Sequence, residues 1–221
     1  MTETGFNNAY ENRQEDAGLS ERAKVLGKWL WVLFWLFVPG IIAGFMKNES
    51  LQVSAPSVYT AGIVLNVVCG AAYGFVLLKL SNVDDEYRTA GIFELIGVAA
   101  ALVMLIFPSL SKDMTISFLV AVPTAVMSLL GEYHEFNAHS NVLIRVSPDL
   151  SDKWKMLWKW LLGCQLATLG CAFVAVISPQ LGMIALFLTA IATVVVYVMK
   201  LIYLYRTAKI FRTYPGEGVL A

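Results

Sequence analysis

Six long apolar segments, separated by short polar ones, dominate this sequence of 221 residues. Each holds roughly 18 or more residues, which is the length that a helix needs to cross the hydrocarbon core of a bilayer. Backbone polar groups cannot bond to water inside a bilayer, so we expect every segment to be an α-helix. The sequence therefore predicts an all-α integral membrane protein with transmembrane helices at about 28–46, 58–79, 91–110, 114–133, 157–177 and 181–203.

The charges predict how the helices are oriented. Fourteen of the sixteen lysines and arginines fall on the side of the spans that holds both termini, and only Lys47 and Lys112 fall on the other side. Because cytoplasmic loops carry the excess of basic residues, both termini are predicted to be cytoplasmic. We expect a disordered tail over 1–18, one six-helix membrane domain over 19–214 and a short tail over 215–221. The zero net charge gives no indication of nucleic-acid binding.

Two pairs of similar segments indicate an internal repeat. Residues 19–30 and 150–161 are identical at seven of twelve positions, and residues 87–93 and 205–211 at six of seven. Both pairs occur in the same order around long apolar regions. We therefore predict a parallel repeat of two-helix units, formed by the first and second spans and by the fifth and sixth, around a middle hairpin formed by the third and fourth.

The segments 19–30 and 150–161, here named the Lys-Trp segments, contain or adjoin all six tryptophans. Tryptophan beside lysine is typical of the membrane–water interface, so each segment is predicted to begin as a surface helix and then turn into the bilayer. Residues 87–93 and 205–211 are here named the heptapeptides. Their arginines, Arg88 and Arg206, would form a cytoplasmic interface together with Trp154 and Trp158. The alternative is a lipid or partner site made of the same residue types.

Polar residues within the spans are few. Asn66 lies centrally in the second span, Gln165 lies in the fifth, and Glu94 lies in the first turn of the third. These three are the candidate ligand-binding residues, because an ionisable or amide side chain inside a membrane usually serves a function. For Glu94 the alternative is a structural ion pair with Arg88 or Arg206, or a contact with the dipole at the start of its helix. No charge is expected deep in the bilayer, so a bound ligand is predicted to be neutral or largely apolar.

A polar cluster follows the fourth span. Glu132, Glu135 and His139 are spaced three and four apart, which places them on one face of a continuous helix. Carboxylate and imidazole groups are ligands for a divalent metal, and this is the one cofactor that the sequence suggests. The alternative is a solvated helix end in which both acids pair with Arg or Lys.

Two functional hypotheses follow. The first is a small transport or solute-binding membrane protein, and the second is a non-transporting scaffold or regulatory subunit that acts through its cytoplasmic face. The sequence lacks a nucleotide-binding loop, a nucleophile elbow and paired catalytic carboxylates, so we do not expect an enzyme. The expected partners are the lipid bilayer and either a second copy of the chain or another membrane or cytoplasmic protein.

Overall fold

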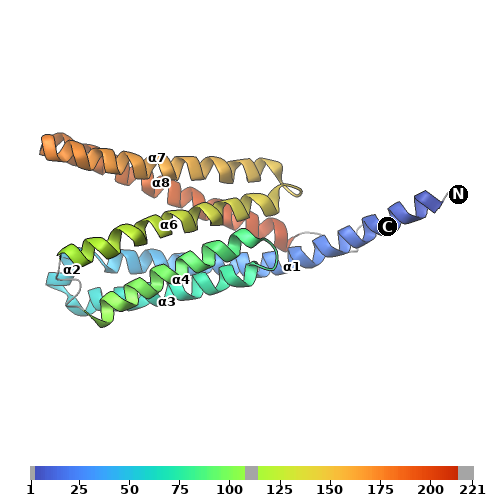
Figure 1. Cartoon of the computed structure of the whole chain (residues 1–221), viewed down its shortest axis with the longest axis horizontal. Helices are drawn as coiled ribbons and strands as arrows, with labels where there is room; N and C mark the ends of the chain where they lie inside the picture. The colour runs from blue at the N-terminus through green and yellow to red at the C-terminus, as the bar shows by residue number, and fades with distance from the viewer. Residues whose placement is uncertain (1–2, 108–113, 214–221) are drawn as a thin grey trace.

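In a computed structural model, the chain is a bundle of long helices (Figure 1). The structure describes residues 3–107 and 114–213, with side chains from Ser20 onward except those of Glu49, Met114 and Ser117. The described residues contain no strand. The helices are α1 (Glu3–Met46), α2 (Glu49–Ser54), α3 (Pro56–Leu80), α4 (Asp85–Ile106), α6 (Met114–Leu143), α7 (Pro148–Ile177) and α8 (Pro179–Arg212).

Five of the described helices are long and apolar enough to cross a bilayer. They are residues 20–46 of α1 and the whole of α3, α4, α7 and α8. The prediction of an all-helical, multi-pass membrane protein is therefore confirmed at this level. The helix α6 has 30 residues and carries Glu132 and Glu135 near its C-terminal end.

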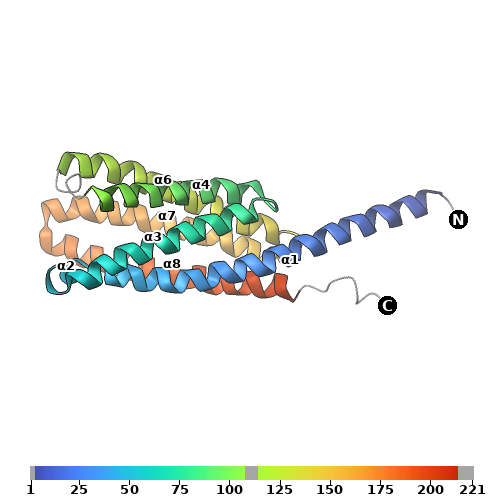
Figure 2. The same ribbon diagram turned by 90° about the horizontal axis from the view of Figure 1, so that it is seen from below.

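The long helices form a closed ring in chain order. Each packs on the helices before and after it, and α8 completes the ring by packing on α1 (Figure 2). The α3–α4 turn, the α6–α7 turn and the C-terminus of α8 share one end, here named the basic end because most lysines and arginines lie there (Figure 1). The opposite end, with α2 and the α7–α8 turn, is named the distal end.

Local sequence explains where several helices begin. Proline occupies the first position of α3, α7 and α8, where its missing N–H costs no hydrogen bond and its fixed backbone angle favours a helix. Asp84 caps α4, since its carboxylate accepts a hydrogen bond from the Glu86 backbone N–H at 2.9 Å. Asp84 and Pro148 begin helices at the basic end, whereas Pro56 and Pro179 begin helices at the distal end.

Close packing is concentrated toward the basic end. The largest fully buried side chains include Leu30, Tyr87, Phe136, Trp154 and Leu204, which come from five different helices. Toward the distal end, α7 and α8 diverge from α6 (Figure 1), and apolar side chains of this hairpin are exposed in that region. The buried core of the described residues therefore lies mainly toward the basic end.

The two Lys-Trp segments adopt the same helical pattern. Their matched lysines are exposed, and their matched serines and leucines are buried: Ser20 and Ser151, Leu26 and Leu157, Leu30 and Leu161. Neither segment turns before it enters the bundle, because α1 and α7 run through without a break. The predicted surface helix is therefore wrong, and an unbroken helix keeps every backbone hydrogen bond satisfied on the way in.

The two heptapeptides, in contrast, occupy different places in the fold. Residues 87–93 open α4 at the basic end, whereas residues 205–211 lie near the C-terminus of α8 at that same end. Residues 87–93 therefore lie at the start of a helix that runs away from the basic end, whereas residues 205–211 lie at the end of a helix that runs toward it. A parallel two-helix unit remains a prediction that the matched Lys-Trp segments support and the heptapeptides do not.

The described part of the predicted N-terminal tail stands apart from the bundle. The helix α1 begins at Glu3 and projects past the basic end (Figure 1), so its first residues form no part of the ring. The disordered tail expected over 1–18 stays a prediction. The tail expected over 215–221 lies outside the described residues.

Candidate functional site

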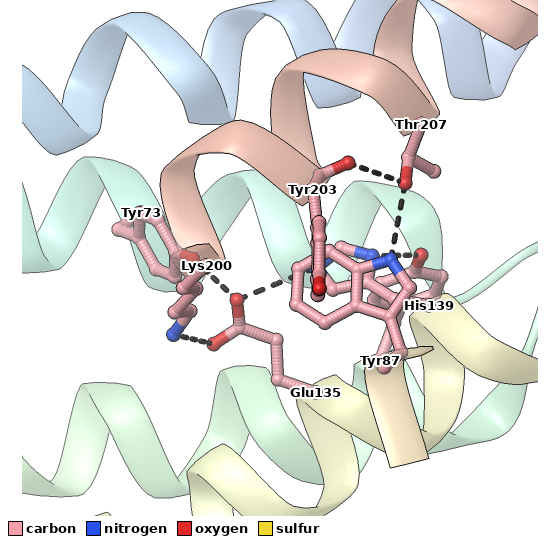
Figure 3. A network of polar contacts seen from close by, with 8 residues as sticks. Tyr73, Tyr87, Glu135, His139, Lys200, Tyr203 and Thr207 are labelled. Atoms are coloured by element: carbon pink, nitrogen blue, oxygen red, sulfur yellow. Dashed lines mark hydrogen bonds and ion pairs between the residues drawn. The ribbon is translucent and has the colours of Figure 1, made fainter. Parts of the chain in front are cut away.

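Glu135 of α6 is the centre of a buried polar network (Figure 3). Its Oε1 accepts a hydrogen bond from the Tyr73 hydroxyl of α3 at 2.5 Å, and its Oε2 accepts one from Lys200 Nζ of α8 at 3.1 Å. A charge taken out of water is costly unless it is paired and hydrogen-bonded, and each of these two charges has such a partner. The network therefore fixes α3, α6 and α8 relative to one another.

His139 extends the network by one helical turn. Its Nδ1 lies 2.8 Å from the Tyr87 hydroxyl of α4, and its Nε2 lies 3.4 Å from Glu135 Oε1. If the tyrosine donates to Nδ1, the proton of the neutral imidazole is on Nε2 and points at the carboxylate. That contact lacks the alignment of a hydrogen bond, and Nε2 has no other partner among the described residues.

Aromatic side chains enclose the polar atoms. The Trp154 ring of α7 lies over His139, with centroids 4.5 Å apart, and its Nε1–H donates to Thr207 Oγ1 of α8 at 3.1 Å. The Lys200 amine lies 5.1 Å from the ring of Phe136 and 6.0 Å from that of Phe37 on α1. All six long helices therefore contribute a side chain to this site.

The network contains more acids than bases. Glu132 accepts a hydrogen bond from the Tyr197 hydroxyl at 3.2 Å, and Glu94 lies close enough to Glu135 and Lys200 to interact electrostatically. Lys200 is the one buried lysine or arginine in the described part of the chain. The site thus combines three carboxylic acids with one ammonium group, an arrangement that can hold or exchange protons.

The predicted metal site is not supported by the structure. Glu132, Glu135 and His139 do lie along one side of α6, but no set of three His, Cys, Asp or Glu side chains among the described residues is placed to hold a metal. Both carboxylate oxygens of Glu135 already accept hydrogen bonds. The alternative, a solvated helix end, is also wrong for Glu135 and His139, which are 3% and 0% exposed.

The candidate ligand-binding residues are separated by the fold. Glu94 lies at the edge of the network, but Asn66 and Gln165 are half-buried residues of α3 and α7, which are not neighbours in the ring. Lys200 and Glu135 are buried charges inside the bundle, which the residue pattern does not predict. The expectation that no charge lies deep in the bilayer stays a prediction, because burial in the bundle does not fix the depth in a membrane. Since these two charges neutralise each other, they do not require a charged ligand.

The predicted interface residues also differ in their surroundings. Arg88 and Arg206 are exposed at the basic end, and Trp158 is half-buried with its ring centroid 5.2 Å from that of Tyr133. Trp154 is completely buried, so a membrane anchor is the wrong role for it. Trp154 and Trp158 are four residues apart and lie on one side of α7, and this side faces the other helices rather than the membrane surface at Trp154.

Sequence reasoning missed Lys200, Tyr73 and Tyr87. Lys200 is one of the fourteen basic residues that the charge count places on the side of both termini, yet it lies inside the predicted span 181–203, and α8 continues for twelve residues beyond it, to Arg212. Its position inside an apolar span is the available signal, because a lysine far from a helix end cannot easily reach the interface. No comparable signal marks Tyr73 or Tyr87, which differ from other interfacial tyrosines only by their partners.

Fold and site together define a multi-pass α-helical membrane protein whose polar centre is buried toward one end of the bundle. No protein-family model matches the chain, and neither the curated proteins nor the solved structures include a significant match to it.

Proposed function

We propose that this protein is a small transport or solute-binding membrane protein for a neutral or largely apolar molecule. One observation carries the proposal: Glu132 and Glu135 of α6 are bonded to side chains of α8, whereas the residues of α6 that continue the side of Glu132 one to three turns toward the distal end are exposed.

This side of α6 follows from helical periodicity. Ser128, Ala125 and Ala121 precede Glu132 by four, seven and eleven residues, which places all of them on the side of α6 that carries Glu132. Glu132 is half-buried and bonded to Tyr197 of α8, whereas the other three residues are exposed. Beyond the side-chain bonds between α6 and α8, this side of α6 therefore continues with small exposed side chains, and we place the ligand beside them.

The opposing face of α8 shows the same change. Val194 and Ala190 precede Tyr197 by three and seven residues, and both are exposed, Val194 by 61%. Thr193 is half-buried, and its hydroxyl donates to its own helix at the Thr189 carbonyl. The exposed residues named on α6 and α8 are mostly apolar, with a few hydroxyl groups, and this chemistry supports a neutral or largely apolar solute.

The same proposal includes six spans. The helix α6 is as long as its neighbours and packs between α4 and α7, so we place it across the bilayer as the sixth span. The bundle part of α1 begins and α8 ends at the basic end, which agrees with an even number of crossings. The excess of lysine and arginine supports a cytoplasmic location for that end.

Native mass spectrometry of the full chain, purified in a mild detergent, tests this function. We expect the wild-type protein to retain a small molecule that organic solvent extracts. A125W fills the space beside Ser128 and should abolish retention. V126W adds the same ring on the side of α6 away from Glu132, where Val126 is 52% exposed, and should retain the molecule.

Two results would count against the proposal. Equal retention by A125W and the wild type would place the ligand elsewhere. A stoichiometric protein partner in place of any small molecule would favour the scaffold hypothesis.

A further inference from the structure

A groove between α1 and the last turn of α8 lies at the basic end, outside the polar network. Its volume is about 580 Å³, and Lys24, Lys28, Trp31 and Arg212 line it together with Gly27 and apolar neighbours. Gly27 makes this arrangement possible, because a Cβ there would lie 3.0 Å from the Arg212 Cα. The glycine thus lets α8 bring its arginine close to the two lysines of α1.

The groove carries three positive charges and no acidic side chain. Lys24 and Lys28 are one turn apart on α1, and Arg212 comes from the other helix. Among the side chains that the structure describes, no acid forms an ion pair with any of the three, and Glu21, which precedes Lys24 by one turn, does not line the groove. Like charges gathered from two helices repel each other, and an anion in the groove would offset this repulsion.

Aromatic residues place the groove at the surface of the membrane. The Arg212 guanidinium lies 5.3 Å from the ring centroid of Trp31, which also neighbours Phe34 at 5.6 Å and Tyr205 at 5.8 Å. Such aromatic residues at the end of an apolar helix lie at the level of the lipid headgroups. The three cations are thus at the depth where lipid phosphates lie.

An apolar path leads from the groove into the membrane. Trp35, Val38 and Ile42 follow Trp31 by four, seven and eleven residues, so they continue its face of α1, and they are 57%, 36% and 51% exposed. A soluble anion makes no contact with this apolar path. A lipid does, because its acyl chains can lie along it.

We propose that the groove binds an anionic phospholipid. Lys24, Lys28 and Arg212 hold the phosphate of the headgroup, and the acyl chains follow the exposed face of α1. The groove volume is within the range of small-molecule sites and is large enough for a headgroup. The lipid joins α1 to the end of α8, where the ring of helices closes.

Binding of phosphatidylglycerol and phosphatidylcholine to the full chain, measured by native mass spectrometry from mixed micelles, tests the proposal. We expect the wild type to prefer phosphatidylglycerol by at least roughly tenfold, with the preference falling as salt rises. The variant K24Q/K28Q/R212Q should lose this preference. The matched control R88Q/K155Q/K159Q removes the same charge from exposed positions outside the groove and should keep the preference within about threefold.

Three results would overturn the proposal. One is a wild-type protein without a preference for phosphatidylglycerol. Another is an equal loss of preference in the control variant, which would indicate attraction to the basic end as a whole. The third is displacement of phosphatidylglycerol by millimolar inorganic phosphate, which would indicate a site for a soluble anion. Thermal unfolding of both variants near the wild-type temperature would show that the comparison concerns binding rather than folding.

Discussion

Glu135 and Lys200 form a buried ion pair that joins α6 to α8, with Oε2 and Nζ 3.1 Å apart and side chains that are 4% and 5% exposed. The pair joins the α7–α8 hairpin to α6 across the bundle. Its contribution to stability can be measured directly.

The single variants E135Q and K200M should each destabilise the protein by about 3–5 kcal/mol, because each leaves one buried charge without its partner. The double variant E135Q/K200M removes both charges, and we expect it to be more stable than either single variant. Unfolding titrations in mixed detergent micelles measure all three.

The exposed pair of Lys153 and Asp149, 3.7 Å apart on α7, provides the matched control. K153A should change the free energy of unfolding by less than about 0.5 kcal/mol, since an exposed ion pair contributes little. If the losses in E135Q and K200M simply add in the double variant, the two charges do not stabilise each other.

Much of this arrangement follows from local sequence, and some of it does not. Runs of apolar residues fix which segments are helices, and the turn signals Asp84 and Pro148 fix where two of them begin. The spacing of Glu132, Glu135 and His139 also predicts their shared face. These features depend only on residues that are close in the sequence, so the helical period of the residue pattern is enough to predict them.

The partners of those residues depend on which helices meet, and that information is absent from a single helix. Nothing near Glu135 indicates that Lys200, 65 positions later, supplies its counter-charge. For the same reason Trp154 resembles an interfacial anchor in the sequence, yet its ring lies between α6 and α8. The repeat does not help to place the Trp154 side chain, because the matched position in the first Lys-Trp segment is Ala23 and holds no aromatic ring.

The close approach at Gly27 predicts a difference between two glycines. G27A should destabilise the protein by about 1–3 kcal/mol, because its methyl group would press on the backbone of Arg212 and Phe211. G163A is the control, since no neighbouring atom lies within 4 Å of a Cβ at that position. It should alter stability by no more than about 1 kcal/mol, in the direction of helix propensity. Equal effects would show that α1 and α8 are not in close contact at the basic end.

The burial of Trp154 predicts how its fluorescence responds to lipid. In a variant with Trp154 as the sole tryptophan and phenylalanine at the other five positions, brominated phosphatidylcholine should leave the emission almost unquenched. In the matched variant that keeps only Trp160, which is 64% exposed, the same lipid should quench strongly. Equal quenching of the two variants would show that Trp154 is exposed to lipid and is not buried between the helices.

Labelling of single cysteines tests the orientation of the bundle. After the three native cysteines are replaced by alanine, Q52C places a thiol in α2 at the distal end, and D149C places one in the first turn of α7 at the basic end. Both native side chains are exposed, so either thiol can react from solution. We expect a membrane-impermeant maleimide to label Q52C in intact cells, and to label D149C only after the membrane is permeabilised, because the basic residues retain their end in the cytoplasm. Labelling of D149C alone in intact cells would show that the topology is the reverse of the predicted one. Labelling of both thiols in intact cells would rule out an odd number of crossings between the two positions.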